Sequence, residues 1–522
     1  MLAESLLAEF SSTPMLDYAR PEAEAGMREA IERVRSKFGA TYPLVIGGKR
    51  ITTRETFQSK NPANPSEAVG SFSKATVEHV SEAVAAADRA FQSWSQTTPA
   101  ARAEVILKAA EILRRRRHEM NATMILEVGK SWGEADGDTA EAIDFLEFYA
   151  REMIRWGGPH PLVPNPGEKN DLVYIPLGVG VVIPPWNFPC AIAMGMTAAT
   201  LVTGNSAILK PSSDAPLTAW KIFEILEEAG VPPGVLTFLS GPGGVIGDAL
   251  VEHPRVRFVA FTGSMEVGIG INERAARVPK GQIWLKRAIL EMGGKDFTIL
   301  DEDADLAAGV EGVYQGAFGF QGQKCSACSR AIVHEKLYDE FVERLRERTE
   351  RTTIGSTEKR EVFLGPVVSA SAEKKILEYM EIGKAEGRLI AGGGKHSGPG
   401  YFLQPTVFAD VKPSARIAQE EIFGPVLAVI RARSFEEAVE IANGTIYGLT
   451  GAYYSRDRAK VEEAKRRLYV GNLYLNRKCT GALVGIHPFG GFNMSGTDSK
   501  AGGRDYLGLF LQAKSIAEYT GS

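Results

Sequence analysis

Cysteine is scarce in this sequence, with 4 residues among 522. So few cysteines exclude a disulfide scaffold and are typical of a reducing compartment, and the N-terminal stretch MLAESLLAEFSS lacks the basic start and long apolar core of a signal peptide. We therefore expect a cytoplasmic protein. Zinc is disfavoured as well, because a structural site needs about four ligands and His334 is the only histidine close in sequence to Cys325 and Cys328. We expect no resident metal.

The chain also lacks an excess of charge of either sign, with a formal net charge of -4 and a pI near 6.1. This charge balance gives no indication that the chain binds nucleic acid or an anionic membrane surface. With 44% hydrophobic and 24% charged residues, its 522 residues can form more than one packed core. The expected partner is a small molecule.

No apolar stretch is long enough to cross a membrane. Residues 172–209 carry no charged side chain, but prolines at 176, 184, 185 and 189 divide them. No piece then reaches the roughly 20 residues that a helical span requires. The stretch is better interpreted as buried core of an α/β sheet.

From residue 179 onward, short β-branched runs alternate with helical patterns, as in VGVVI, FPCAIAMGMTAATLV and SAILK. This alternation predicts a parallel, doubly wound sheet. A second α/β region is expected from about 297 to 485. Before them, apolar spacing and capping residues predict helices over 22–39 and 77–91 and another that begins at Thr98 and Pro99. The tail YLGLFLQAKSIAEY has no turn signal and could pair with another element or subunit.

Polar residues follow several of the expected strands, where open α/β sheets bind their ligands. They are Asn187 in PPWNFP, Lys210 in ILKPSSD and Glu291 in LEMGGKD. The turn TGSMEVG opens a helix and suits a phosphate, although Gly263 and Gly268 do not form the usual dinucleotide fingerprint. Taken singly, each has an ordinary alternative: a backbone-capping amide, a surface charge, a solvated carboxylate or a bare turn.

The CxxC pair in GFQGQKCSACSR also has more than one interpretation. A redox pair usually opens a helix directly after a strand in a short domain, whereas Cys325 and Cys328 follow a glycine-rich run deep in a long chain. Two buried structural cysteines, or one nucleophile with a bystander, remain open on the residues alone.

The joint pattern is more specific than any single motif. PWNFP, LKP, FTGSMEVG, EMGGKD, GQKCSACSR, EEIFGP and PFGGFNMSG occur in this order, and together they resemble the aldehyde dehydrogenase superfamily from VIGGK at 45 onward. The resemblance implies an α/β fold with a Rossmann-type cofactor domain, an α/β catalytic domain and a small oligomerisation flap. The bounds it suggests are 1–153 and 176–297 for the NAD(P)-binding domain, 298–485 for the catalytic domain, and 154–175 with 498–522 for the oligomerisation hairpin and tail.

The same resemblance implies roles for individual residues. Cys325 matches the nucleophile, and Cys328 lies at a position where the family commonly has a small residue. Asn187 matches the oxyanion-hole amide, and Glu291 matches the general base. Lys210 and Glu421 match ribose contacts, and Ser264 matches a pyrophosphate contact. The positions implied for cofactor binding are Ile183, Trp186, Lys210, Ser213, Gly243, Phe261, Ser264, Gly293, Glu421 and Phe423.

The expected cofactor is NAD, with NADP also possible. Many NAD-preferring relatives carry a glutamate at the position of Ser213, where its carboxylate accepts from the adenosine ribose and repels a 2′-phosphate. That charge is missing here, although the adjacent Asp214 could contribute.

Within the superfamily, YPLVIGG, EAIDFLEFYARE and NRKCTGALVGIHPFGGFNMSGT look like the 1-pyrroline-5-carboxylate dehydrogenases. This resemblance implies oxidation of L-glutamate γ-semialdehyde to L-glutamate through a Cys325 thiohemiacetal and thioester, the last step of proline degradation, by a homo-oligomer. The loop at 480–485 would hold the substrate carboxylate on backbone N–H groups. An enzyme for another semialdehyde or an aliphatic aldehyde, and a non-catalytic member, remain alternatives. The implied substrate-binding residues are Glu141, Lys324, Ser326, Gly481, Ala482 and Phe489.

Overall fold

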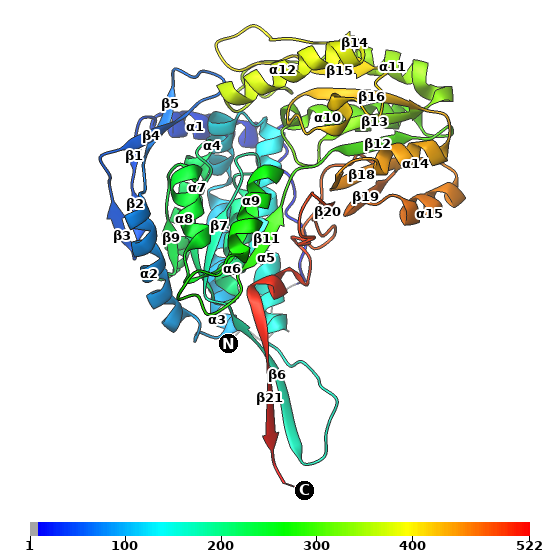
Figure 1. The fold of residues 1–522 in the computed structure, drawn as a ribbon. Helices are drawn as coiled ribbons and strands as arrows, with labels where there is room; N and C mark the ends of the chain where they lie inside the picture. The colour runs from blue at the N-terminus through cyan, green and yellow to red at the C-terminus, as the bar shows by residue number, and fades with distance from the viewer. Residues whose placement is uncertain (1–8, 522) are drawn as a thin grey trace.

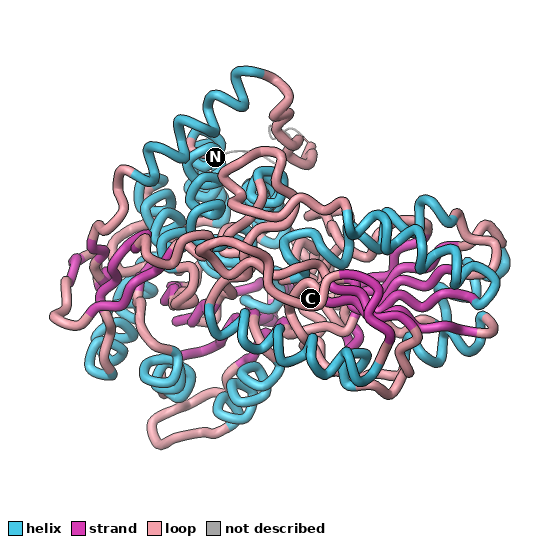
Figure 2. The backbone as a smooth tube through the Cα atoms, turned by 90° about the horizontal axis from the view of Figure 1, so that it is seen from above, coloured by secondary structure: helices cyan, strands magenta, loops and turns pink. Residues whose placement is uncertain are grey.

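Two seven-stranded sheets dominate the structure, a computed structural model that describes residues 9–521 (Figure 1). Residues 1–8 and Ser522, which belong to the expected segments 1–153 and 498–522, lie outside the described residues. Helices flank the strands on both sides, as Figure 2 shows. None of the helices between residues 9 and 521 is long and apolar enough to span a membrane.

The first sheet has the strand order β11-β10-β7-β8-β9-β2-β3. The strands from β11 to β9 are parallel, and β2 is antiparallel to both of its neighbours. Its strands are β2 (Leu44–Ile46), β3 (Lys49–Ile51), β7 (Val179–Ile183), β8 (Ser206–Leu209), β9 (Leu236–Phe238), β10 (Val256–Thr262) and β11 (Arg287–Glu291).

The three helices predicted before residue 120 begin at or within one residue of the expected positions. The Thr98 hydroxyl accepts a hydrogen bond from the Ala101 N–H at 3.2 Å, so the expected cap and the Pro99 start are both present. The expected helix over 22–39 is shorter, because it ends at Arg35. The helices around this sheet are α1 (Pro21–Arg35), α2 (Val77–Trp94), α3 (Pro99–Arg115), α4 (Arg117–Val128), α5 (Trp132–Trp156), α6 (Ala191–Val202), α7 (Pro216–Ala229), α8 (Asp248–Glu252) and α9 (Met265–Ala276).

The second sheet has the order β14-β15-β16-β13-β12-β18-β19 and is parallel except for β14. Its strands are β12 (Asp296–Leu300), β13 (Cys328–His334), β14 (Arg388–Ala391), β15 (Thr406–Ala409), β16 (Val426–Ala432), β18 (Thr450–Tyr454) and β19 (Asn472–Leu475). Its helices are α10 (Leu306–Phe318), α11 (Glu335–Glu350), α12 (Ala370–Glu386), α13 (Arg416–Gln419), α14 (Phe435–Asn443) and α15 (Arg458–Arg467). The predicted α/β class with parallel sheets is confirmed.

Smaller elements complete the part of the chain that the structure describes. A three-stranded sheet contains β1 (Thr41–Tyr42), β4 (Thr56–Lys60) and β5 (Ala68–Ser73), and a two-stranded one contains β17 (Tyr447–Gly448) and β20 (Phe492–Asn493). Short helical turns are a π-helix at Gly243–Gly247 and 3-10 turns at Gly319–Gly322 and Tyr506–Phe510.

A two-stranded ribbon projects from the body of the molecule (Figure 1). It pairs β6 (Glu168–Pro176) antiparallel with β21 (Leu511–Tyr519), so the tail is a strand that pairs with another element. The prediction that 172–209 is buried core is wrong for residues 172–176, because exposed and partly buried residues alternate along β6. The absence of charge hid this alternation, since Val173 and Ile175 are exposed although they are apolar, while Leu172, Tyr174 and Pro176 are partly buried.

Candidate active site

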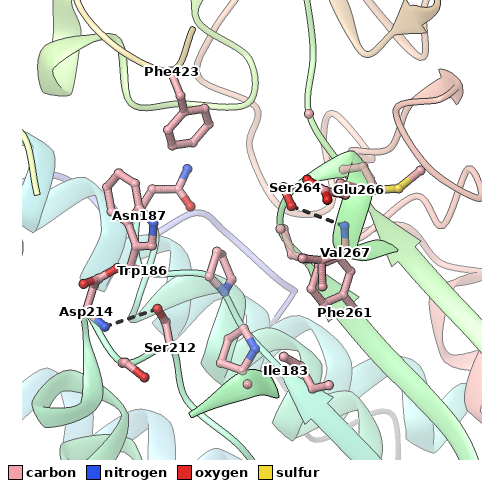
Figure 3. Close-up of a pocket in the computed structure, with 18 of the residues that line it drawn as sticks. Ile183, Trp186, Asn187, Ser212, Asp214, Phe261, Ser264, Glu266, Val267 and Phe423 are labelled. Atoms are coloured by element: carbon pink, nitrogen blue, oxygen red, sulfur yellow. Dashed lines mark hydrogen bonds between the residues drawn. The ribbon is translucent and has the colours of Figure 1, made fainter. Parts of the chain in front are cut away.

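A cleft of about 960 Å³ opens between the ends of strands of the first sheet and loops of the second half of the chain. Figure 3 shows Trp186, Asn187 and Phe423 on one side of it and Phe261 and Ser264 on the other. Cys325 and Asn187 line this cleft together with all the residues predicted to bind the cofactor. The latter are Ile183, Trp186, Lys210, Ser213, Gly243, Phe261, Ser264, Gly293, Glu421 and Phe423.

The strand order explains this convergence. Asn187 follows β7, Lys210 follows β8, the 262–264 turn follows β10 and Glu291 ends β11, and these strands are parallel. Their carboxyl ends therefore meet at one edge of the sheet, where open α/β sheets bind ligands.

The turn between β10 and α9 is suited to an anion. Ser264 is the N-cap of α9, and its hydroxyl accepts a hydrogen bond from the Val267 N–H at 3.4 Å (Figure 3). The first turn of the helix, including Glu266, borders the cleft. Free N–H groups and the helix dipole at this end favour a phosphate group.

Lys210 and Glu421 lie on opposite halves of the cleft. Burial lowers the pKa of Lys210 to about 8, and its ammonium donates to the Pro211 carbonyl at 3.2 Å, which leaves further donors for a ligand. Glu421 accepts a hydrogen bond from the Gly294 N–H at 3.1 Å. A Cβ at Gly293 would lie 2.3 Å from the Glu421 carboxylate, so only glycine leaves this carboxylate in place.

Cys325 occupies a loop between Gly319–Gly322 and β13. The Gln321 amide holds this loop by donating to the carbonyls of Gly129 at 3.0 Å and Pro366 at 2.8 Å. The pKa of the Cys325 thiol lies well above its usual range, mainly because of burial and then because of the charges of Asp296 and other nearby carboxylates. The resting group is a thiol, so a base must remove its proton before it can attack.

Asn187 is tied to the same loop. Asn187 is 4% exposed, and its side-chain amide donates to the Gln323 carbonyl at 3.1 Å. The amide carries two hydrogens, so the second one is free for a ligand beside Cys325.

Glu291 does not border the main cleft but ends β11 beside the segment at 495–499. It accepts a hydrogen bond from the Ser499 hydroxyl. Burial raises the pKa of the Glu291 carboxyl to about 7, and the Ser499 hydrogen bond opposes part of this increase. A carboxyl with a pKa near 7 is suited to general-base work at neutral pH.

The second cysteine of the pair has a different environment. Cys328 begins β13, is 1% exposed, and its thiol donates to the Thr298 hydroxyl at 3.3 Å. It contributes nothing to the lining of the main cleft. Between residues 9 and 521, no group of three or more His, Cys, Asp or Glu side chains is placed to hold a metal ion.

The predicted substrate-binding residues lie outside the lining of the main cleft. Lys324 forms an ion pair with Glu134 at 2.7 Å, and Cys479 donates to the Ser326 carbonyl at 3.5 Å. Burial, followed by the Asp138 charge, raises the pKa of the Glu141 carboxyl to about 8. The remaining three, Gly481, Ala482 and Phe489, belong to the irregular segment after β19.

Sequence reasoning missed several residues of the site. Ser499 is not among the predicted residues, and neither are several other residues that line the cleft. The glycine-rich stretch SGTDSKAGG at 495–503 was the available signal for Ser499. The cleft residues missed include Gly244, Asp248, Arg274, Met292, Ser369 and Lys375.

Comparison with known proteins defines the class. The model of the aldehyde dehydrogenase family matches residues 50–516, and the chain belongs to this family. It is 55% identical to the 1-pyrroline-5-carboxylate dehydrogenase of Geobacillus sp. (strain WCH70) over 513 residues, which cover 98% of this chain and 100% of the relative.

Solved structures of other aldehyde dehydrogenases are also similar to this chain. The 1-pyrroline-5-carboxylate dehydrogenase from Thermus with bound NAD is 52% identical, with a TM-score of 0.97 over 98% of this chain and 99% of that one. Betaine aldehyde dehydrogenase from Staphylococcus aureus, in complex with NAD+, is 31% identical, with a TM-score of 0.88 over 95% of this chain and 98% of the other.

Proposed function

We propose that this chain oxidises L-glutamate γ-semialdehyde, the open form of 1-pyrroline-5-carboxylate, to L-glutamate with NAD, as the last step of proline degradation. The observation that carries the proposal is the convergence of Cys325 and Asn187 on one cleft, with Glu291 close enough to Cys325 for its charge to affect the thiol. The names of the relatives support the substrate.

The first chemical step forms a bond between Cys325 and the aldehyde carbon. A base removes the thiol proton, the sulfur attacks, and the negative charge moves to the aldehyde oxygen. The free hydrogen of the Asn187 amide and the Cys325 N–H hold this oxyanion, and each donor contributes on the order of 3 kcal/mol to stabilising the transition state. The product of the step is a thiohemiacetal.

The cleft fits a dinucleotide. Ser264 and the first turn of α9 would hold the pyrophosphate, while Lys210 and Glu421 would hold ribose hydroxyls. Trp186 and Phe423, which pack edge to face with ring centroids 5.5 Å apart, would line the nicotinamide end of the cleft. Bound NAD supplies the acceptor for the hydride that leaves the substrate carbon, and Cys325 then carries a thioester.

Hydrolysis of the thioester requires an activated water. The Glu291 carboxylate takes a proton from this water, the oxygen attacks the thioester carbon, and the Cys325 sulfur leaves and recovers a proton. The released acid is L-glutamate. The pKa of about 7 leaves a substantial fraction of Glu291 ionised at neutral pH.

We assign the remote end of the substrate to the 480–485 loop. Backbone N–H groups of Gly481 and Ala482 would bind the α-carboxylate, and the Ser326 hydroxyl would add a further contact. Glu141, Lys324 and Phe489 complete the proposed pocket. Binding energy from this end would place the aldehyde within reach of Cys325.

The assembly is also part of the proposal. Residues 1–153 and 176–297 would bind NAD(P), residues 298–485 would carry the nucleophile, and residues 154–175 with 498–522 would join subunits of a cytoplasmic homo-oligomer. The projecting ribbon of β6 and β21 supports the last assignment.

The test compares kcat/KM for 1-pyrroline-5-carboxylate and for pentanal, with NAD reduction as the readout. We expect the semialdehyde to be favoured by several powers of ten, because loop donors built for a carboxylate stay unpaired with pentanal. Cys325→Ala should abolish turnover with both substrates and leave NAD binding near normal. Comparable values for the two aldehydes would favour a general aldehyde dehydrogenase, and no turnover with any aldehyde would favour a non-catalytic member.

A further inference from the structure

Arg477 follows β19 and turns its guanidinium toward the 480–485 loop. One of its nitrogens, Nη2, donates to two successive backbone carbonyls, that of Thr480 at 3.1 Å and that of Gly481 at 2.9 Å. The guanidinium also lies over the Tyr474 ring, 4.6 Å from its centroid. Arg477 is therefore fixed by β19 on one side and by the loop on the other.

These two hydrogen bonds determine where the neighbouring N–H groups point. In a trans peptide, the C=O of one residue and the N–H of the next lie in one plane and point in opposite directions. A guanidinium that holds the carbonyls of Thr480 and Gly481 on one side thus directs the N–H groups of Gly481 and Ala482 to the other side. Gly481 has φ of 85°, a conformation that suits glycine.

Other contacts hold the second half of the loop but leave these two donors free. The Leu483 N–H donates to the His487 ring at 3.2 Å, and the Gly485 N–H donates to the Gly502 carbonyl at 2.9 Å. Within residues 9–521, the N–H groups of Gly481 and Ala482 have no protein acceptor. Two adjacent free donors in a fixed turn form a site for a carboxylate.

The loop also lies next to the nucleophile's segment. Cys479, which directly precedes it, is fully buried and donates to the carbonyl of Ser326, the residue after Cys325. A ligand held by the loop is therefore kept in a fixed relation to the nucleophile through this short connection.

We propose that Arg477 is a positioning residue for substrate specificity, which fixes the peptide planes of the 480–485 loop so that two N–H groups bind the carboxylate of an amino-acid aldehyde. The role rests on the proposed function. Arg477 acts through the loop, since the nitrogen that faces the loop is occupied by two carbonyls.

The test uses Arg477→Met, which keeps most of the side-chain volume and removes every donor. The matched control is Arg431→Met, because Arg431 also lies over a tyrosine ring, that of Tyr338 at 3.9 Å, and donates to Asp339 at 2.7 Å. We expect Arg477→Met to raise KM for 1-pyrroline-5-carboxylate at least tenfold and to change kcat/KM for pentanal less than twofold. The control should change neither value more than twofold. Pentanal activity in the same preparation shows that the fold and the catalytic residues are intact.

A second variant separates position from charge. Arg477→Lys keeps the positive charge but cannot hold two carbonyls with one planar group, so it should recover less than a third of the lost affinity. Full recovery with lysine would overturn the positioning role in favour of simple attraction, and an unchanged KM in Arg477→Met would overturn it outright. If wild-type enzyme does not prefer the semialdehyde to pentanal, the proposed function fails instead, and the two failures are distinguishable.

Discussion

At the scale of single residues, the Glu291 carboxyl should control the pH dependence of turnover. Its pKa is raised to about 7, chiefly by burial, and only the ionised form accepts a proton from the hydrolytic water. The steady-state rate should therefore rise as the pH increases through about 7 and fall below it, provided that thioester hydrolysis limits turnover. Glu291→Gln should give a burst of NADH with little steady turnover, measured by stopped-flow absorbance.

Ser499 provides the matched variant for this profile. Its hydroxyl donates to the carboxylate and lowers the pKa of Glu291, so Ser499→Ala should shift the profile to higher pH without abolishing turnover. An identical profile in both proteins would mean that another group controls the rate, and normal steady turnover in Glu291→Gln would remove Glu291 from the mechanism.

Ser213 leads to a prediction about the cofactor. It is exposed and lines the cleft next to Ser212 and Asp214, and the Asp214 N–H donates to the Ser212 hydroxyl at 3.3 Å (Figure 3). Without a carboxylate at 213, the penalty against a 2′-phosphate should be modest, so NADP should support measurable activity with NAD preferred. Ser213→Glu should increase the ratio of kcat/KM for NAD to that for NADP.

Asp214 is the control for this interpretation. If the wild type shows no activity with NADP, another charge excludes it, and Asp214→Asn should then restore activity. Ser213→Ala should leave the preference near that of the wild type, because it adds no charge.

The residues that the alternation of strands and helices alone could predict are those placed by regular structure. Asn187, Lys210 and Ser264 follow strands, and Glu291 ends one, so the βα alternation brings them together once the strands are parallel. Ser499 and Arg477 reach their partners through irregular segments, whose course depends on many long-range contacts. No periodicity in the sequence predicts such a course, and both residues were missed.

At the scale of elements, a buried carboxylate caps α7. Glu127 is 1% exposed, and it accepts from the Leu217 N–H at 2.6 Å, the Thr218 N–H at 2.8 Å and the Thr218 hydroxyl at 2.7 Å. Ser59 adds a fourth donor at 3.1 Å. Glu127→Ala leaves these buried donors without a partner, at a cost of about 1–3 kcal/mol for each one that water cannot reach.

We therefore expect Glu127→Ala to lower the midpoint of urea unfolding clearly, with catalytic constants of the folded enzyme little changed. Glu127→Gln should lose less, because its amide keeps one oxygen acceptor. Glu78→Ala, which removes an exposed carboxylate from the first turn of α2, is the control and should leave the midpoint nearly unchanged. A normal midpoint in Glu127→Ala would show that water satisfies the α7 donors.

Elements with a clear period or cap were predicted well, as for α2 and α3. The β6 strand is not predicted, because its run of uncharged residues indicates a buried strand, whereas β6 forms a projecting ribbon in which exposed and partly buried residues alternate. Residues 9–20 form no regular element, yet they are held by distant contacts such as the Leu16 N–H to Asp136 at 2.7 Å. Contacts over more than a hundred residues cannot be read from local patterns.

At the scale of the whole molecule, the cleft depends on two sheets that fold around separate cores. Among the proposed site residues, Lys210 and Ser264 follow strands of the first sheet, while Cys325, Glu421 and Phe423 come from the second half of the chain. The order of motifs indicated that both halves contribute, but the relative placement of the halves follows only from their packing. The sequence therefore predicts candidate members of the site, whereas their geometry depends on how the two halves pack.

The projecting ribbon gives the last prediction. A two-stranded ribbon is marginally stable by itself in water, and Val173, Ile175 and Ile516 are 36–38% exposed on it. These features fit a ribbon that is covered by another copy of the chain.

A truncated chain tests this prediction. Removing residues 514–522 takes away most of β21 but keeps the contacts that anchor its start. In these contacts the Arg287 guanidinium donates to the Leu511 carbonyl at 2.6 Å, and Arg257 donates to the Gln512 side chain at 3.2 Å. Light scattering after size exclusion should show wild-type protein at a multiple of 56.5 kDa and the truncated chain close to 56.5 kDa. Lys514→Ala, which keeps the strand, should retain the wild-type mass. A truncated chain with an unchanged mass would place the subunit interface elsewhere, and a monomeric wild type would contradict the oligomer itself.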